Sequence, residues 1–293
     1  MPNVIVNDVD LHYLEWGDPG AGAPLAVLLH GFPDSAHTWR HLGPALADAG
    51  FHAVAPFLRG YAPSGVPADG RYQTAMLALD ALELRSALGG DDRAVLVGHD
   101  WGAVATWVAA VHGGASAWRR VAGMAVPPGG AMATAFFRYE QLKRSWYMFF
   151  FQHPLSDMVV PMDDLAFIDG LWADWSPGYD ATEDLELLKP SLRAPENLAA
   201  ALGYYRATLS GVGVDPALAD VQASGPQPPP QPALYLHGRD DGCIGVVVAD
   251  GAEEFLTAPG SRAEIVEHAG HFLHLERPDV VNPLVVDFLT AAP

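Results

Sequence analysis

The chain has little cysteine, little positive charge and no long apolar run. Its single cysteine, Cys243, can form neither an internal disulfide nor an all-cysteine zinc site. Only 16 Lys and Arg stand against 35 Asp and Glu, a formal net charge of −19, so nucleic acid and anionic membranes are not expected partners. The aromatic stretch 146–151 is too short to cross a bilayer, and residues 1–10 lack a secretory signal. We therefore expect a cytoplasmic protein.

The first half of the chain alternates between strand-like and helix-like patterns. With 293 residues, 50% of them hydrophobic, the chain can build one large domain or a core with an insertion. The expected strands are 4–6, 11–16, 25–29, 52–55, 94–97 and 121–126. The expected helices are 38–49, 73–88 and 102–112. This alternation predicts an α/β fold with a mostly parallel central sheet flanked by helices.

The alternation stops after residue 126 and resumes a hundred residues later. Residues 127–225 are rich in aromatics and interrupted by prolines, which predicts an inserted helical lid. After a proline-rich return at 224–232, strands are expected at 233–236 and 263–266, with helices at 246–256 and 278–289. The predicted organisation is therefore a core of 1–126 and 226–293 with a lid of 127–225.

The strongest chemical motif is Gly98-His99-Asp100-Trp101-Gly102. It follows a buried strand and opens a helix, which is the setting of a nucleophile elbow, here with Asp at the usual Ser position. The glycines are needed because the central residue sits on a strained turn. A carboxylate is already ionised at pH 7 and can attack without a base, leaving an ester on Asp100. The alternative is that Asp100 only caps the helix.

Hydrolysis of such an ester needs a histidine held by an acid. The order nucleophile, acid, histidine indicates Asp241 and His271, because both follow predicted strands near the carboxyl edge of the sheet. Asp240 remains an alternative acid and His274 an alternative histidine. His268, His271 and His274 recur every third residue, but no zinc motif is present, so we expect neither a metal nor a cofactor.

A second loop motif, His30-Gly31-Phe32-Pro33, follows another buried strand. Such a loop supplies one N–H group to an oxyanion hole, and the residue after the nucleophile supplies the other. The predicted donors are therefore the backbone N–H groups of Phe32 and Trp101. An ordinary glycine turn is the alternative.

Together, these motifs resemble the α/β-hydrolase fold superfamily, and within it the epoxide hydrolases, over essentially the whole chain. The resemblance covers residues 30–35, 98–102 and the loop 59–61. The family's lid carries two tyrosines that bind and protonate the epoxide oxygen, and it implies this role for Tyr147 and Tyr205, with Tyr204 as the rival for the second. Two positions depart from the family pattern: Phe57 replaces the usual Asp, and Leu155 replaces a Gly.

The resemblance implies hydrolysis of a small-molecule epoxide by water through a covalent ester. Substrate contacts are expected from Phe32, Trp101, Tyr147, Phe151 and Tyr205. The many lid aromatics indicate an apolar epoxide, with aryl epoxides included; they are Trp146, Phe149, Phe150, Phe151, Trp172 and Trp175. The alternatives are a haloalkane dehalogenase that uses the same Asp, or a ligand-binding relative without turnover. The oligomeric state stays open.

Overall fold

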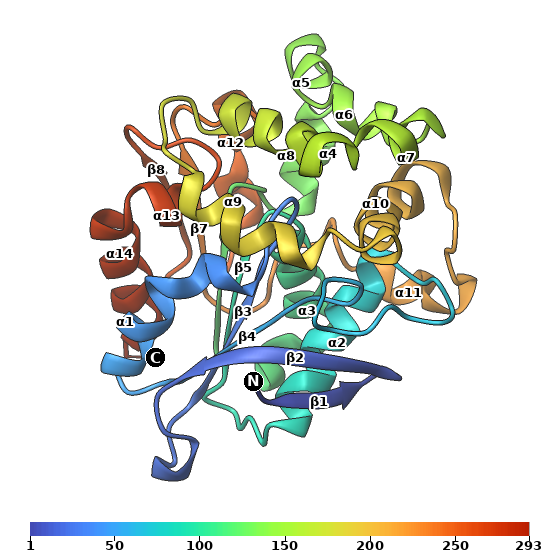
Figure 1. Cartoon of the computed structure of the whole chain (residues 1–293). Helices are drawn as coiled ribbons and strands as arrows, with labels where there is room; N and C mark the ends of the chain where they lie inside the picture. Colours follow the sequence, from blue (N-terminus) through green and yellow to red (C-terminus); the bar gives the residue numbers. More distant parts are fainter. Residues whose placement is uncertain (293) are drawn as a thin grey trace.

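The computed structural model describes residues 1–292, which form a sheet, flanking helices and a helical layer above them (Figure 1). Within these residues the sheet has eight strands in the order β1-β2-β4-β3-β5-β6-β7-β8. The β1/β2 and β2/β4 pairs are antiparallel and the others parallel. The strands are β1 (Asn3–Val6), β2 (Val9–Trp16), β3 (Leu25–Leu29), β4 (His52–Pro56), β5 (Val95–His99), β6 (Arg120–Met124), β7 (Ala233–Gly238) and β8 (Arg262–Val266).

The central strands are buried along their whole length, whereas the outer strands are not. Every residue of β3 to β7 is buried, while β1 and β8 are largely exposed or half-buried. Continuous apolar runs such as 25–29 are stable here because helices exclude water from both faces of the sheet. The predicted α/β class and all the predicted strands are confirmed, with shifts of one or two residues at some ends.

Helices cover the two faces of the sheet. In Figure 1, α1 (Leu42–Asp48) and α14 (Pro278–Thr290) lie together on one side, and α2 (Thr74–Ala87) and α3 (Trp101–Ala117) pack together on the other. The short helices α12 (Val246–Ala249) and α13 (Leu273–Glu276) follow β7 and β8. Short 3-10 helices span Pro19–Ala21, Ala36–Arg40, Lys189–Ser191, Pro216–Leu218 and Ala252–Phe255.

Two predicted helices are shorter than expected. The segment 38–49 begins as a 3-10 turn and becomes α-helical only in α1, because Pro44 has no N–H to bond the carbonyl of Arg40. The segment 246–256 is divided between α12 and a 3-10 turn, since Gly251 has φ 91° and reverses the local backbone.

Between β6 and β7 the chain forms helices joined by loops. In Figure 1 the green helices of this segment lie above the carboxyl ends of the strands, and its last, orange helix lies beside α2. These helices are α4 (Gly129–Ala135), α5 (Tyr139–Arg144), α6 (Trp146–Phe150), α7 (Leu155–Val159), α8 (Met162–Trp175), α9 (Thr182–Leu188), α10 (Pro195–Ser210) and α11 (Ala219–Gln222). We call this segment the lid; its limits at 127 and 225 stay a prediction.

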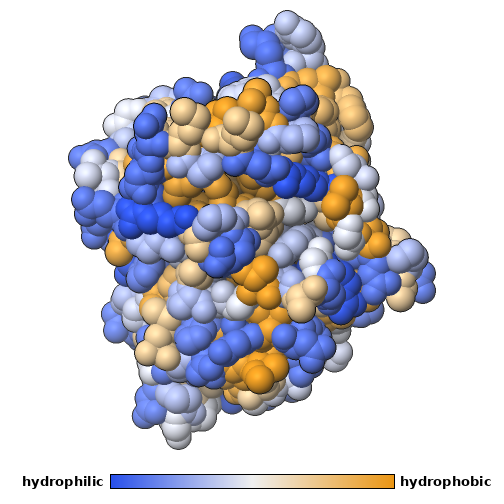
Figure 2. Space-filling model, turned by 45° about the vertical axis from the view of Figure 1, so that its right-hand side comes forward, coloured by the Kyte–Doolittle hydropathy of each residue, from blue (hydrophilic) through white to orange (hydrophobic). Residues whose placement is uncertain are grey.

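In Figure 2, hydrophobic residues gather in the upper part of one face. Among the described residues, no helix is long and apolar enough to cross a membrane.

Candidate active site

Asp100 occupies the turn between β5 and α3. Its φ of 51° lies in the left-handed region, which is a strained conformation for a residue with a side chain. The flanking glycines make the turn possible, because a Cβ on Gly98 would lie 2.1 Å from the carbonyl oxygen of Gly102. A Cβ on Gly102 would lie 2.0 Å from the carbonyl oxygen of Leu29. The expected strand-turn-helix setting of Asp100 is therefore present.

The two carboxylate oxygens of Asp100 have different surroundings. Oδ1 accepts a hydrogen bond of 2.8 Å from the backbone N–H of Phe32. Oδ2 lies 3.6 Å from Nε2 of His271. Trp101 is the first residue of α3, where a backbone N–H has no acceptor within the helix. The loop after β3 and the N-terminus of α3 thus meet at this carboxylate.

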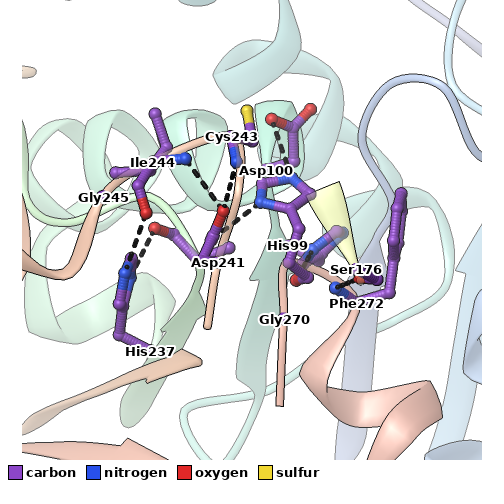
Figure 3. Close-up of polar contacts among 12 residues, drawn as sticks. His99, Asp100, Ser176, His237, Asp241, Cys243, Ile244, Gly245, Gly270 and Phe272 are labelled. Carbon is purple, nitrogen blue, oxygen red and sulfur yellow. Dashed lines mark hydrogen bonds and ion pairs between the residues drawn. The ribbon is translucent and has the colours of Figure 1, made fainter. Parts of the chain in front are cut away.

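His271 is held by Asp241, the third residue after the end of β7. Nδ1 of His271 lies 2.9 Å from Oδ2 of Asp241. The other oxygen of Asp241 accepts hydrogen bonds from the N–H groups of Cys243 and Ile244, at 2.7 and 2.8 Å (Figure 3). Asp240 is exposed, whereas Asp241 is buried. The structure therefore brings together Asp100, His271 and Asp241 rather than Asp240.

Burial and charge act in opposite directions on this pair. Burial alone would raise the pKa of Asp241, but the charge and hydrogen bond of His271 lower that pKa below its usual value. Burial alone would lower the pKa of His271, but Asp241 and Asp100 outweigh it and raise that pKa to about 10. The charges of Asp241 and Asp100 therefore favour the imidazolium form of His271.

Two tyrosines of the lid pack edge to face on the same cavity as Asp100. The rings of Tyr147 in α6 and Tyr205 in α10 have centroids 5.6 Å apart, and both residues are almost fully buried. The Tyr147 hydroxyl lies 3.3 Å from Sγ of Cys243, and the Tyr205 hydroxyl has no hydrogen-bond partner among the described residues. Tyr204, by contrast, donates to the carbonyl of Arg59 at 2.8 Å.

A cavity of about 410 Å³ borders Asp100 and the two lid tyrosines, but not His271 or Asp241. Its wall includes Asp100, Trp101, Tyr147 and Tyr205 together with apolar side chains of α3, α4 and α10. Phe32 and Phe151 do not line it; their rings pack against Tyr205 with centroids 5.2 and 5.1 Å away. In this structure Tyr205 therefore lies between the cavity and these two predicted substrate contacts.

The lid tryptophans and phenylalanines that the sequence analysis selected do not line the cavity. Trp146 and Phe149 are about half exposed. Trp172 stacks on Phe272 and Trp175 packs against His271. The cavity wall instead contains residues that the sequence analysis did not select, among them Val104, Trp107, Val108, Met132, Phe136, Phe137 and Leu209. Apolar spacing in α3 and α4 was a signal, but it predicts burial without saying which buried face borders a cavity.

A second buried acid and histidine group lies beside the first. Asp34, His99 and His274 each have one side-chain atom that could bind a metal ion, and these three atoms lie within 4.8 Å of one another. His274 Nε2 lies 2.6 Å from Oγ1 of Thr38, and none of the three side chains lines the cavity. The histidine triplet considered from the sequence does not converge, because His268 is exposed.

The positions that depart from the family pattern have ordinary local roles. Phe57 is buried, and its carbonyl accepts a hydrogen bond of 2.7 Å from the Ser64 hydroxyl. Leu155 begins α7 and is 47% exposed. Neither residue borders the cavity.

Comparisons with known proteins agree with this geometry. A family model described as alpha/beta hydrolase fold matches residues 24–278. Epoxide hydrolase A of Mycobacterium tuberculosis is 32% identical over 98% of this chain and 96% of that protein. The crystal structure of epoxide hydrolase A from Mycobacterium thermoresistibile is 29% identical, with a TM-score of 0.80 over 98% of this chain and 97% of that one.

A variant epoxide hydrolase from Bacillus megaterium, solved with its product 3-naphthyloxy-propane-1,2-diol, is 28% identical with a TM-score of 0.80. That match covers 99% of this chain and 100% of the other. The sheet order, the elbow and the family model define an α/β-hydrolase fold protein. Within that fold, the chain belongs to the epoxide hydrolase family.

Proposed function

We propose that this epoxide hydrolase converts apolar epoxides, including aryl epoxides, to vicinal diols through a covalent ester on Asp100. The observation that carries the proposal is that one cavity wall contains the carboxylate of Asp100 and the side chains of Tyr147 and Tyr205. A nucleophile and two proton donors can therefore reach the same small molecule. The reaction uses only the epoxide and water.

In the first step, Oδ2 of Asp100 attacks an epoxide carbon and the carbon–oxygen bond of the ring breaks. The oxygen leaves as an alkoxide, a strong base that Tyr147 and Tyr205 stabilise and one of them protonates. Burial comes first among the causes that raise the pKa of both phenols, so each stays protonated and ready to donate at neutral pH. Oδ1 remains on the N–H of Phe32.

In the second step, His271 removes a proton from water, and the water oxygen attacks Cγ of the ester. The oxyanion rests on the N–H groups of Phe32 and Trp101 until the diol oxygen leaves and Asp100 is regenerated. The proton taken by His271 replaces the one that the tyrosine gave, so the cycle is balanced. Asp241 keeps the imidazole oriented throughout.

Ester formation also prepares the base. The negative charge of Asp100 helps to raise the pKa of His271, and this charge disappears when the ester forms. The pKa of His271 then falls, the imidazolium gives its proton to the phenolate that the first step leaves, and the neutral imidazole can accept a proton from water. The first step thus activates the residue that the second step needs.

One observation favours haloalkane dehalogenation as the second candidate. Nε1 of Trp101 is buried, lines the site and has no hydrogen-bond partner in residues 1–292, as a halide donor would. A halide needs no proton, however, so that reaction gives no role to the two tyrosines. The proposal includes no nucleic-acid partner, because the net charge is −19. The cytoplasmic location expected from the sequence stays a prediction.

Intact-protein mass spectrometry of the His271→Gln variant tests the proposal. Offered aryl and alkyl epoxides, the variant should gain the whole mass of the epoxide, because the ester forms and its hydrolysis stalls. The adduct should disappear in the Asp100→Asn, His271→Gln double variant. An adduct formed only from haloalkanes, without the halogen, would move the assignment to dehalogenation. No adduct, together with no diol from the wild type, would contradict both reactions.

A further inference from the structure

The cavity extends from Asp100 along α3. Val104 and Val108 line it on successive turns of α3, and Gly225, which follows α11, lines it beside Val108. A Cβ on Gly225 would lie 3.2 Å from Cγ2 of Val108, so the two residues meet at this end. Asp100 and Val108 are eight residues apart, which corresponds to about 12 Å along a helix. The cavity is therefore elongated along α3.

Surface residues form a rim at the end of the cavity away from Asp100. Phe137 beyond α4 is 77% exposed, and Leu209 near the end of α10 is 37% exposed. Gln222 and Pro226, at and after α11, are exposed as well. The rim thus comes from three separate segments, while Asp100 and both tyrosines lie in the buried part. A substrate must enter with its epoxide ring first.

On its other side, Asp100 faces packed residues. A Cβ on Gly31 would lie 2.4 Å from the Cβ of Asp100, so the loop after β3 leaves no space there. Phe32 and Phe151 are fully buried and their ring centroids are 5.6 Å apart. The ring of Trp175 packs against the rings of His271 and Tyr147, with centroids 5.1 and 4.9 Å away. Aromatic rings therefore close the cavity behind the reacting carboxylate.

We propose that the enzyme is selective for terminal epoxides that carry one long apolar substituent, and that Val108 and Gly225 set the length it accepts. The unsubstituted carbon fits the closed end, and the substituent lies along α3 toward the rim. A trans-disubstituted epoxide would drive its second substituent against Phe32, Phe151 and Trp175, whose packing resists displacement. This inference rests on the proposed function, because it concerns the same carboxylate and tyrosines.

The first test compares two isomers with equal composition and nearly equal hydrophobicity. These are the terminal decene oxide and the trans decene oxide with its ring at the centre of the chain. We expect kcat/KM for the terminal isomer to be higher by about tenfold to a hundredfold, the range that overpacking produces. Equal rates, or faster hydrolysis of the internal isomer, would overturn the inference.

The second test shortens the cavity at its far end. Val108→Phe should lower kcat/KM for terminal decene oxide by about tenfold or more while leaving propylene oxide almost unchanged, because only the long chain reaches residue 108. Val247→Phe is the matched control, since Val247 is exposed on α12 and does not line the cavity. Gly225→Val fills the same end from the opposite wall and serves if Val108→Phe folds poorly. Equal losses on both substrates, or none, would contradict the length assignment.

These outcomes are separable from failure of the proposed function. If the wild type hydrolyses propylene oxide and forms the Asp100 ester but treats the decene oxide isomers alike, only the selectivity inference fails. If no epoxide is hydrolysed and no ester forms, the proposed function fails and the inference with it.

Discussion

Two buried groups of an acid and histidines lie side by side in this protein, and only one of them faces the carboxylate of Asp100, which lines the cavity. The rings of His99 and His271, one from each group, have centroids 4.9 Å apart. Asp241 accepts hydrogen bonds from two backbone N–H groups and His271, whereas Asp34 accepts one of 2.7 Å from the N–H of Ser35. The two groups therefore share residue types but differ in how their charges are compensated.

The electrostatics of the two groups are opposite as a result. Burial raises the pKa of Asp34 well above its usual range and lowers the pKa of His99 to about 3. Burial also lowers the pKa of His274 well below its usual value. Burial therefore favours the uncharged forms of the side chains in the second group, whereas Asp241 and Asp100 favour the charged form of His271 in the first. A buried acid and histidine become reactive only where charges are compensated and one atom faces a cavity.

The largest expected effect separates the two acids. Asp100→Asn removes the proposed nucleophile and should lower kcat by about 10⁴-fold or more, as loss of a nucleophile does in triad enzymes. Asp34→Asn should retain most of the activity, because Asp34 does not line the cavity. Steady-state hydrolysis of styrene oxide measures both. Loss of activity in Asp34→Asn with an unchanged fold would show that the second group takes part in the reaction.

The next largest effect concerns the orientation of His271. Asp241→Asn should lower kcat on the order of 10⁴-fold, because an amide neither holds the imidazole in the required tautomer nor stabilises its charge. Single-turnover kinetics should show a larger loss in ester hydrolysis than in ester formation. Asp240→Asn is the matched control and should behave as the wild type, since Asp240 is exposed. The reverse result would make Asp240 the acid.

A smaller effect distinguishes the three lid tyrosines. Tyr147→Phe and Tyr205→Phe should each lower kcat by about 10²-fold, the range for loss of a positioned proton donor. Tyr204→Phe loses a hydrogen bond to the Arg59 carbonyl and should instead cost about 1 kcal/mol of unfolding free energy. The prediction is tested by measuring kcat for epoxide hydrolysis and urea unfolding curves for all three variants. A catalytic loss in Tyr204→Phe that exceeds the loss in Tyr205→Phe would exchange the roles.

The smallest effect is a shift in the titration of His271, followed by NMR of its ring protons. Asp100→Asn should lower the pKa of His271, because it removes one of the charges that raise it. His274→Gln should change that pKa little. Because the folded pKa lies above the value of about 6.5 for an unfolded imidazole, His271 stabilises the fold fully below pH 6.5. This contribution is lost as the pH rises through about 10, and an unfolding free energy that grew over that range because of His271 would contradict the assignment.

Much of the fold could be predicted because apolar runs and turn residues are local signals. The strands 25–29 and 262–266 and the helices α2 and α14 follow from such patterns. The helix boundaries near Pro44 and Gly251 were less accurate, since they depend on one missing N–H and one left-handed residue. In the site, Asp100, His271 and Asp241 could be selected because each lies within five residues of the carboxyl end of a strand, and these ends face the same edge of the sheet.

The sequence by itself determined the α/β class, the family resemblance and the strand-end position of each reacting group, because these depend on periodicity and short motifs. Only the tertiary structure decided which Tyr hydroxyl is free, which acid and histidine group faces Asp100, and which apolar side chains form the wall of the cavity. The physical reason is that these properties depend on packing between segments far apart in the chain. Leu209 and Met132 read alike as apolar helix residues, and only the folded chain places both on the wall of one cavity.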